Sequence, residues 1–129
     1  MSGQYTWCFG CGKDNPHGLH LEFFFADGKF TARFTPLEQH QGYNGRVHGG
    51  IIAAMLDEAM GSYINTTTGK EVFTAHIDIR YRKAVSIGCE IIIAGELVRQ
   101  KGRFYEMKGE IYLSDGSLAA EAKGKFLEA

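Results

Sequence analysis

The sequence lacks the features that mark membrane, secreted and nucleic-acid-binding proteins. No apolar run reaches the length that spans a bilayer, which excludes an integral membrane protein. The start of the chain, Met1 to Tyr5, has no basic stretch followed by an apolar one, so we expect no secretory signal and a cytoplasmic location. The 14 basic and 15 acidic side chains leave a net charge of -1, which argues against a nucleic-acid partner held by bulk electrostatics.

Cysteine is scarce too, and its odd number argues against a disulfide framework. The three cysteines are Cys8, Cys11 and Cys89. The first two form a lone C-x-x-C, which is open to three interpretations: a metal site completed by His17 and His20, a redox pair, or a turn with packed thiols. The close histidine spacing and the turn-like residues 12–16 favour the structural turn, so we expect no metal.

What the chain does contain is enough for one globular domain. Its 129 residues and 44% hydrophobic content fit a single domain over 1–129, with a C-x-x-C-G turn segment at 1–17 and a core at about 18–127. Alternating apolar residues predict a hairpin over 19–34 with a turn at Asp27-Gly28, followed by a loop. A nearly all-apolar helix is predicted over 50–66, and four strands follow at 73–82, 89–99, 104–113 and 118–127.

This order of elements predicts an α+β fold in which a curved antiparallel sheet cradles one helix. The short turns indicate that consecutive strands are neighbours in a meander. Because one sheet covers only one side of a helix that is apolar all round, the other side needs a lid. A second copy of the chain supplies the simplest lid, so we expect a homodimer.

Two carboxylates lie in this apolar helix, Asp57 and Glu58. A carboxylate there is costly unless it is paired, hydrogen-bonded or functional. Asp57 shares its face with a stripe of small residues, which favours a functional role; the stripe consists of Gly50, Ala53, Ala54 and Gly61. For Glu58 the simpler interpretation is a hydrogen bond from the helix edge to a partner chain.

The start of the helix, His48-Gly49-Gly50, forms a second constellation. Unpartnered N–H groups of Gly49 or Gly50 can polarise a carbonyl oxygen, although the glycines can also serve only an unusual entry angle of the chain. Asp57 lies about 10 Å of helix rise from Gly50, too far for both to act on one carbonyl within a subunit. A carboxylate from a facing subunit bridges that gap, and the combination suits acyl-transfer hydrolysis.

The run from His48 to Gly61 closely resembles the helix motif of hotdog-fold acyl-CoA thioesterases of the phenylacetate-pathway type. The stretches 41–47 and 8–19 are similar to a subset of the same superfamily. The resemblance implies a hotdog fold and a dimer, often paired into a tetramer. It also implies hydrolysis of an acyl-CoA thioester to free acid and CoA, without a metal or organic cofactor.

Carried over by position, the resemblance assigns the catalytic carboxylate, acting as base or nucleophile, to Asp57. The N–H that polarises the carbonyl falls on Gly50 or Gly49. His48 becomes a helper near the thioester sulfur or a structural residue of the loop. Glu58 and Gly49 are counted among the substrate-binding residues.

The chain departs from the family pattern at two places. Many members carry Asn six residues before the motif histidine, where this chain has Gly42, so we expect Gln41 to take that role. In the strand after the helix, Lys83 and Ala84 stand where some members have Ser and Pro, which argues against a serine-assisted water.

Basic residues at the rim are expected to hold the phosphates of CoA, and the candidates are Arg80, Arg82, Lys83 and Arg103. Alternating arginines are otherwise simply the solvated face of a strand. Two rival functions remain: a non-catalytic acyl-CoA- or lipid-binding hotdog protein, and a hotdog hydratase or dehydratase. The hydratase is disfavoured because Ala54 stands where its acidic residue falls.

Overall fold

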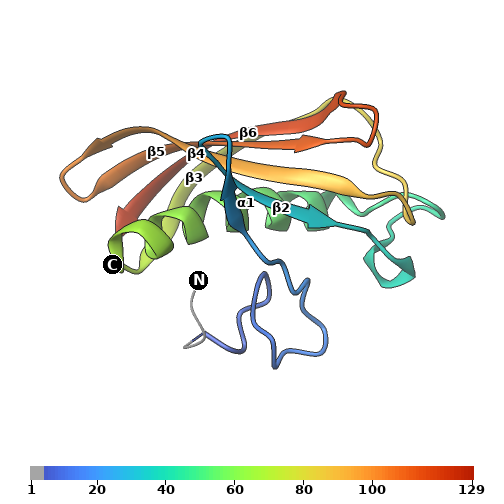
Figure 1. Ribbon diagram of the computed structural model, residues 1–129, viewed down its shortest axis with the longest axis horizontal. Helices are drawn as coiled ribbons and strands as arrows, with labels where there is room; N and C mark the ends of the chain where they lie inside the picture. The colour runs from blue at the N-terminus through green and yellow to red at the C-terminus, as the bar shows by residue number, and fades with distance from the viewer. Residues whose placement is uncertain (1–4) are drawn as a thin grey trace.

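A computed structural model describes residues 5–129. Six antiparallel strands form one curved sheet, and a single long helix, α1 (Gly49–Thr68), lies along one side of it (Figure 1). The strands are β1 (Phe24–Ala26), β2 (Lys29–Phe34), β3 (Val72–Tyr81), β4 (Ile91–Lys101), β5 (Phe104–Tyr112) and β6 (Leu118–Glu128). The α+β hotdog architecture expected from the sequence is confirmed.

The strand order corrects the expected meander at one position. The sheet runs β1-β2-β4-β5-β6-β3, so β4, β5 and β6 are consecutive neighbours as predicted. Strand β3, however, pairs with β6 rather than with β4. The connection over 82–90 is too long for a tight hairpin between β3 and β4. Its first residues are bound to β6, because the N–H groups of Arg82 and Lys83 donate to the Ala119 carbonyl. Strand β3 is therefore an edge strand, with one side unpaired within residues 5–129.

The first expected strand is shorter than the alternation indicated. Strand β1 covers only Phe24–Ala26, although the Asp27-Gly28 turn is present with both residues at positive φ. Leu19 and Leu21 are buried as the pattern predicted, but their N–H groups donate to the carbonyls of Phe9 and Gly10, at 2.8 and 2.9 Å. The alternating pattern therefore predicted the buried residues correctly. Their backbone hydrogen bonds, however, go to the N-terminal loop instead of to a neighbouring strand.

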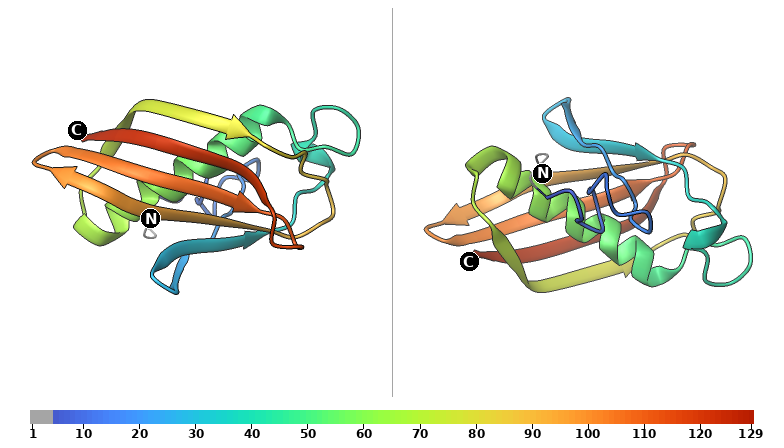
Figure 2. Two further views of the ribbon diagram at one scale, coloured as in Figure 1. Left: turned by 90° about the horizontal axis from the view of Figure 1, so that it is seen from above. Right: turned by 90° about the horizontal axis from the view of Figure 1, so that it is seen from below.

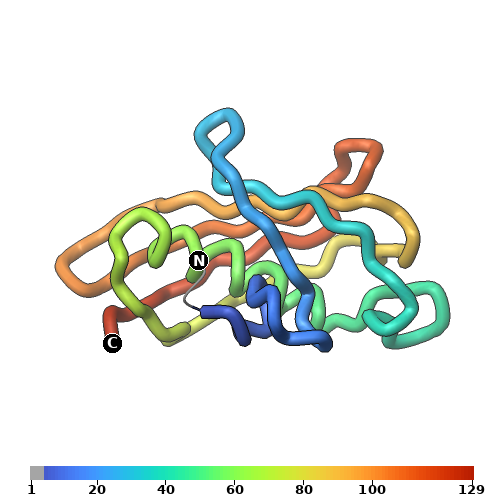
Figure 3. Tube along the Cα trace, turned by 60° about the horizontal axis from the view of Figure 1, so that its bottom comes forward, coloured from blue at the N-terminus to red at the C-terminus, as the bar shows by residue number. Residues whose placement is uncertain are grey.

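The helix packs its apolar face on the sheet and carries the N-terminal segment, residues 5–23, on its opposite side (Figures 1 and 2). The tube in Figure 3 shows this segment crossing α1 before the chain enters β1. The buried helix residues are Ile52, Met55, Leu56, Ala59, Met60, Ser62 and Ile64. The chain thus supplies part of the lid that the sequence assigned wholly to a second copy.

Contact between helix and sheet is closest at Gly95 of β4. A Cβ atom there would overlap the backbone carbonyl oxygen of Ala59. Within residues 5–129, no helix is long and apolar enough to cross a membrane. The predicted absence of a secretory signal partly concerns residues 1–4, which lie outside the described part of the chain. A cytoplasmic location stays a prediction.

Candidate active site

The N-terminus of α1 is capped by its own histidine. His48 is extended, with φ -61° and ψ 137°, and its Nδ1 accepts the Gly50 N–H at 2.8 Å. The sequence predicted an unpartnered N–H at Gly50, but in the structure this N–H is hydrogen-bonded to His48. Among residues 5–129, the Gly49 N–H has no acceptor. Of the two amides proposed to polarise a carbonyl, Gly49 is the one available.

Gly49 lies in a pocket of about 250 Å³ beside the end of β3. The Tyr81 hydroxyl donates to the Gly49 carbonyl at 2.8 Å and so ties the helix start to the strand end. Arg82 and Lys83 line the same pocket, as expected for a basic rim.

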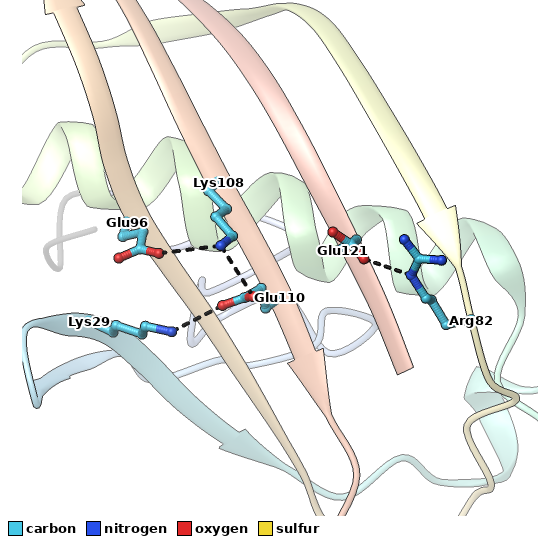
Figure 4. Close-up of polar contacts among 6 residues, drawn as sticks. All are labelled: Lys29, Arg82, Glu96, Lys108, Glu110 and Glu121. Atoms are coloured by element: carbon cyan, nitrogen blue, oxygen red, sulfur yellow. Dashed lines mark hydrogen bonds and ion pairs between the residues drawn. The ribbon is translucent and has the colours of Figure 1, made fainter. Parts of the chain in front are cut away.

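The basic candidates do not all lie together. Arg82 also pairs with Glu121 of β6 at 2.7 Å (Figure 4), and Arg80 lies opposite the same glutamate in the sheet register. Arg103, in contrast, donates to the Glu128 carbonyl at the other end of the sheet. The structure therefore places Arg82 and Lys83 at the Gly49 pocket and Arg103 away from it.

Gln41 braces the loop before the helix. Its Oε1 accepts the Gly45 N–H at 2.6 Å, and its Nε2 donates to the Glu38 carbonyl at 3.1 Å. Both polar ends of the side chain are thus engaged within the loop. The isolated bridge between Gln41 and Val47 keeps this residue next to His48, but its catalytic role stays a prediction.

The neighbouring His40 is one of the few buried polar residues in the described chain. Its Nδ1 accepts the Leu37 N–H at 2.9 Å, and its backbone carbonyl accepts the His48 N–H at 2.9 Å. Burial lowers the pKa of His40, which keeps the ring neutral and able to accept that hydrogen bond. His40 therefore helps to position the loop that ends at His48.

Asp57 is hydrogen-bonded to β3. The Thr74 hydroxyl donates to Asp57 Oδ1 at 2.6 Å, and within residues 5–129 Oδ2 has no hydrogen-bond partner. Both residues line a pocket of about 270 Å³ together with Gly61, Ser62 and Asn65. No sequence motif pointed to Thr74, because its only signal was an ordinary place in an alternating strand.

Glu58 lines the same pocket as Asp57, but its carboxylate contacts the N-terminal segment. The Cys8 thiol lies 3.6 and 3.9 Å from the two Glu58 oxygens, and Cys11 Sγ belongs to the same cluster. Burial raises the pKa of Glu58, and burial together with the Glu58 charge raises that of Cys11. The contacts of Glu58 with substrate or with a partner chain, which the sequence suggested, stay predictions.

The two candidate constellations stay apart within one chain. Asp57 lines one pocket and Gly49 another, and their separation of eight helix positions corresponds to about 12 Å of rise. A single copy therefore places the carboxylate and the free amide at separate positions along β3.

The chain is similar in sequence to curated acyl-coenzyme A thioesterases. It is 32% identical over 89 residues to acyl-coenzyme A thioesterase THEM4 of Bos taurus, covering 68% of this chain and 36% of that protein. It is 30% identical over 104 residues to the Xenopus laevis protein of the same name, covering 80% and 46%. The chain thus spans less than half the length of these relatives.

Solved structures of thioesterase-superfamily proteins share the fold. Zebrafish thioesterase superfamily member 2 superposes with a TM-score of 0.81 at 22% identity, covering 98% of this chain and 95% of that one. A Bacillus halodurans protein solved with CoA gives a TM-score of 0.77 at 26% identity, covering 86% and 75%. The phenylacetate-pathway subtype stays a prediction.

A family model supplies the direct assignment. The model described as the thioesterase superfamily matches residues 44–120, which span the loop before α1, the helix itself and strands β3 to β5. Because this match covers more than half of the chain, the protein belongs to the thioesterase superfamily.

Proposed function

We propose that this protein hydrolyses an acyl-CoA thioester to a free acid and CoA. The observation that carries the proposal is Asp57, a carboxylate on the small-residue face of a buried helix, oriented by Thr74 at 2.6 Å and lining a pocket. A fixed carboxylate beside a cavity is what activation of water, or direct attack, on a carbonyl requires. The names of the curated relatives support the same substrate class.

Chemically, Asp57 acts in one of two ways. As a base it takes a proton from water, which adds to the thioester carbonyl; as a nucleophile it forms an acyl anhydride with the substrate, which water then hydrolyses. In both routes the CoA thiolate leaves and takes up a proton. A single turnover in ¹⁸O-labelled water tests the nucleophilic route, because attack of water on the Asp57 carbonyl of the anhydride leaves the label in the Asp57 carboxylate, which the base route cannot do.

The free amide of Gly49 is the proposed partner of this carboxylate, contributed by a second copy. Strand β3 has an unpaired edge in this chain, and exposed edges of this length are normally covered. Thr74, near the start of β3, is hydrogen-bonded to Asp57, and Tyr81, at its end, is hydrogen-bonded to Gly49.

Antiparallel pairing of two β3 strands centred between Ile77 and Asp78 brings these ends together. Thr74 of one copy then lies opposite Tyr81 of the partner subunit, which sets Asp57 beside the partner's helix start. We therefore propose a homodimer with two shared sites. The further assembly into a tetramer, implied by the family resemblance, is a prediction that sedimentation tests.

Arg82 and Lys83 are proposed to hold the phosphates of CoA, because they line the Gly49 pocket. The Bacillus halodurans structure with CoA supports this ligand class. The acyl group is left open, so the assay uses a panel of acyl-CoAs.

The test is release of free CoA thiol by wild type and by Asp57→Asn. We expect the variant to lose roughly 10²–10⁴-fold in kcat, the range of acid–base catalysis. The matched control is Asp27→Asn, at an exposed turn position with φ 51° that Asn adopts as readily as Asp. An unchanged Asp57→Asn rate would remove Asp57 from the mechanism, and binding without hydrolysis of any thioester by wild type would favour the non-catalytic alternative.

A further inference from the structure

A cluster of side chains of the metal-ligand type lies beside the proposed thioesterase site, and one of them, Glu58, lines the same pocket as Asp57. The Sγ atoms of Cys8 and Cys11 and a carboxylate oxygen of Glu58 all lie within 4.8 Å of one another. The two thiols come from the N-terminal segment, and the carboxylate comes from the middle of α1. We propose that these three residues bind one thiophilic divalent cation, with Zn²⁺ the chemically favoured ion.

The donor set fits that ion. Zn²⁺ takes thiolate sulfur at about 2.3 Å and carboxylate oxygen at about 2.0–2.2 Å, and cysteines separated by two residues are a usual ligand spacing. Donors within 4.8 Å of one another reach those distances through small side-chain shifts. Soft thiolates select Zn²⁺ over Mg²⁺ and Ca²⁺.

The charge at this position also calls for a cation. Deprotonated to bind a cation, the two thiols and the carboxylate would carry three negative charges in a half-buried location. Within residues 5–129, no lysine or arginine forms an ion pair with Glu58. A divalent cation would offset most of that charge, whereas without one the group must hold protons to be buried at low cost.

The backbone around the cluster is shaped for close approach of the three donors. Gly10 lies between the cysteines, and a Cβ atom there would overlap Glu58 Oε1. The Gly12 N–H donates to the Cys8 carbonyl at 2.8 Å, which closes the turn that brings both thiols to one side. The Leu21 N–H donates to the Gly10 carbonyl at 2.9 Å and holds the loop from outside.

The histidines suggested by the sequence are not part of this cluster. His20 Nε2 instead donates to the Asn15 carbonyl at 2.6 Å, so the proposed site has three protein ligands and a fourth position for water. The site would fasten the N-terminal segment to the helix that carries Asp57. The proposal gives Glu58 a role as metal ligand, in place of the substrate contact that the family resemblance implied.

The experiment titrates the chelator-stripped, reduced full chain with Co²⁺, an optical substitute for Zn²⁺. We expect one equivalent to bind with a thiolate-to-Co²⁺ charge-transfer band, Zn²⁺ to abolish the band by displacement, and Zn²⁺ to raise the thermal midpoint of unfolding. Cys8→Ser, Cys11→Ser and Glu58→Gln should each weaken binding at least about 10-fold. Cys89→Ser is the matched control, because this exposed cysteine lies outside the cluster.

The readout is independent of thioester hydrolysis, so it stands whatever the outcome of the Asp57 test. The proposal is overturned if the wild-type chain shows no charge-transfer band. It is equally overturned if Cys8→Ser or Cys11→Ser binds Co²⁺ as tightly as wild type, or if Cys89→Ser weakens binding as much as either of them. The wild-type titration alone can contradict the proposed metal site, so the test remains valid even if one of the variants does not fold.

Discussion

At the scale of single residues, the adjacent carboxylates Asp57 and Glu58 line one pocket but are hydrogen-bonded to different elements. Consecutive helix positions differ by about 100° in direction, so neighbours in sequence face different elements. Asp57 reaches Thr74 on β3, and Glu58 reaches the thiol of Cys8 in the N-terminal segment. The small-residue stripe around Asp57 was visible in the sequence, whereas neither contact partner was.

Thr74 is expected to act as a positioning residue for Asp57. Thr74→Val removes the 2.6 Å hydrogen bond with little change of volume, and we expect kcat to fall about 10- to 100-fold while KM changes little. Thr74→Ser keeps a hydroxyl and should restore most of kcat. Steady-state kinetics of the two variants provide the check, and a Ser variant as slow as the Val variant would contradict an orienting hydrogen bond.

His40 is expected to make the fold less stable as the pH falls. Its folded-state pKa lies below the ordinary value of 6.5 because of burial. Below that value the unfolded chain therefore binds more protons than the folded chain. The contribution of neutral His40 to folding stability is fully present above the unfolded-state pKa and is lost as the pH falls through the folded-state pKa.

The measurement compares urea unfolding at about pH 7.5 and about pH 5.5 for wild type and His40→Asn. The Asn side chain offers an acceptor to the Leu37 N–H but does not titrate. We expect the loss of stability on acidification to be smaller in the variant. Equal losses in both proteins would show that His40 is not responsible.

At the scale of elements, α1 begins and ends close to where the sequence placed it. The expected range was 50–66, and the helix covers Gly49–Thr68, with His48 capping its start and Gly69 in the left-handed region at its end. Its burial is less uniform than expected, because Gly49 is exposed and Ala53 and Asp57 are only half-buried.

Two glycines at the contact between helix and sheet should respond oppositely to alanine. In Gly95→Ala the new Cβ meets the Ala59 carbonyl oxygen, a backbone atom that cannot move freely, so we expect a loss of about 1–3 kcal/mol in stability. In Gly61→Ala the Cβ meets Phe126 at an ordinary 3.5 Å, and the higher helix propensity should add about 0.5–1 kcal/mol.

Chemical denaturation of both variants against wild type measures these differences. A Gly95→Ala protein as stable as wild type would show that β4 and α1 do not approach so closely. Gly61→Ala serves as the matched control for the same substitution made on the helix.

At the scale of the whole molecule, the proposed site is divided between two copies. One chain holds Asp57 near one end of β3 and the Gly49 amide near the other, in separate pockets. A shared site predicts that two inactive variants restore one another when they assemble together.

The two variants are Asp57→Asn and Gly49→Pro. Proline removes the Gly49 N–H, fits the first position of a helix, and follows the extended His48, so the fold should tolerate it. In a mixed dimer, isolated by two different tags, one of the two sites has both intact groups. We therefore expect about half of the wild-type activity from the mixed dimer, although each variant alone is inactive.

Sites confined to single subunits would leave the mixed dimer as inactive as its parents. A mixed dimer carrying Asp57→Asn in one copy and Asp57→Asn with Gly49→Pro in the other is the control, because neither of its sites has a carboxylate. Failure of wild type to form dimers in sedimentation would also contradict the shared site.

The sequence by itself determined the α+β class with one helix on a curved sheet, the turn at Asp27-Gly28, the extent of α1 and the face that carries Asp57. These features follow from local patterns: apolar periodicity, turn residues and the composition of one helix face. The tertiary structure decided that β3 pairs with β6, that His48 caps Gly50, that Thr74 orients Asp57 and that Glu58 meets two thiols. Those contacts join residues far apart in the chain or depend on which way a side chain turns, and no local pattern encodes either.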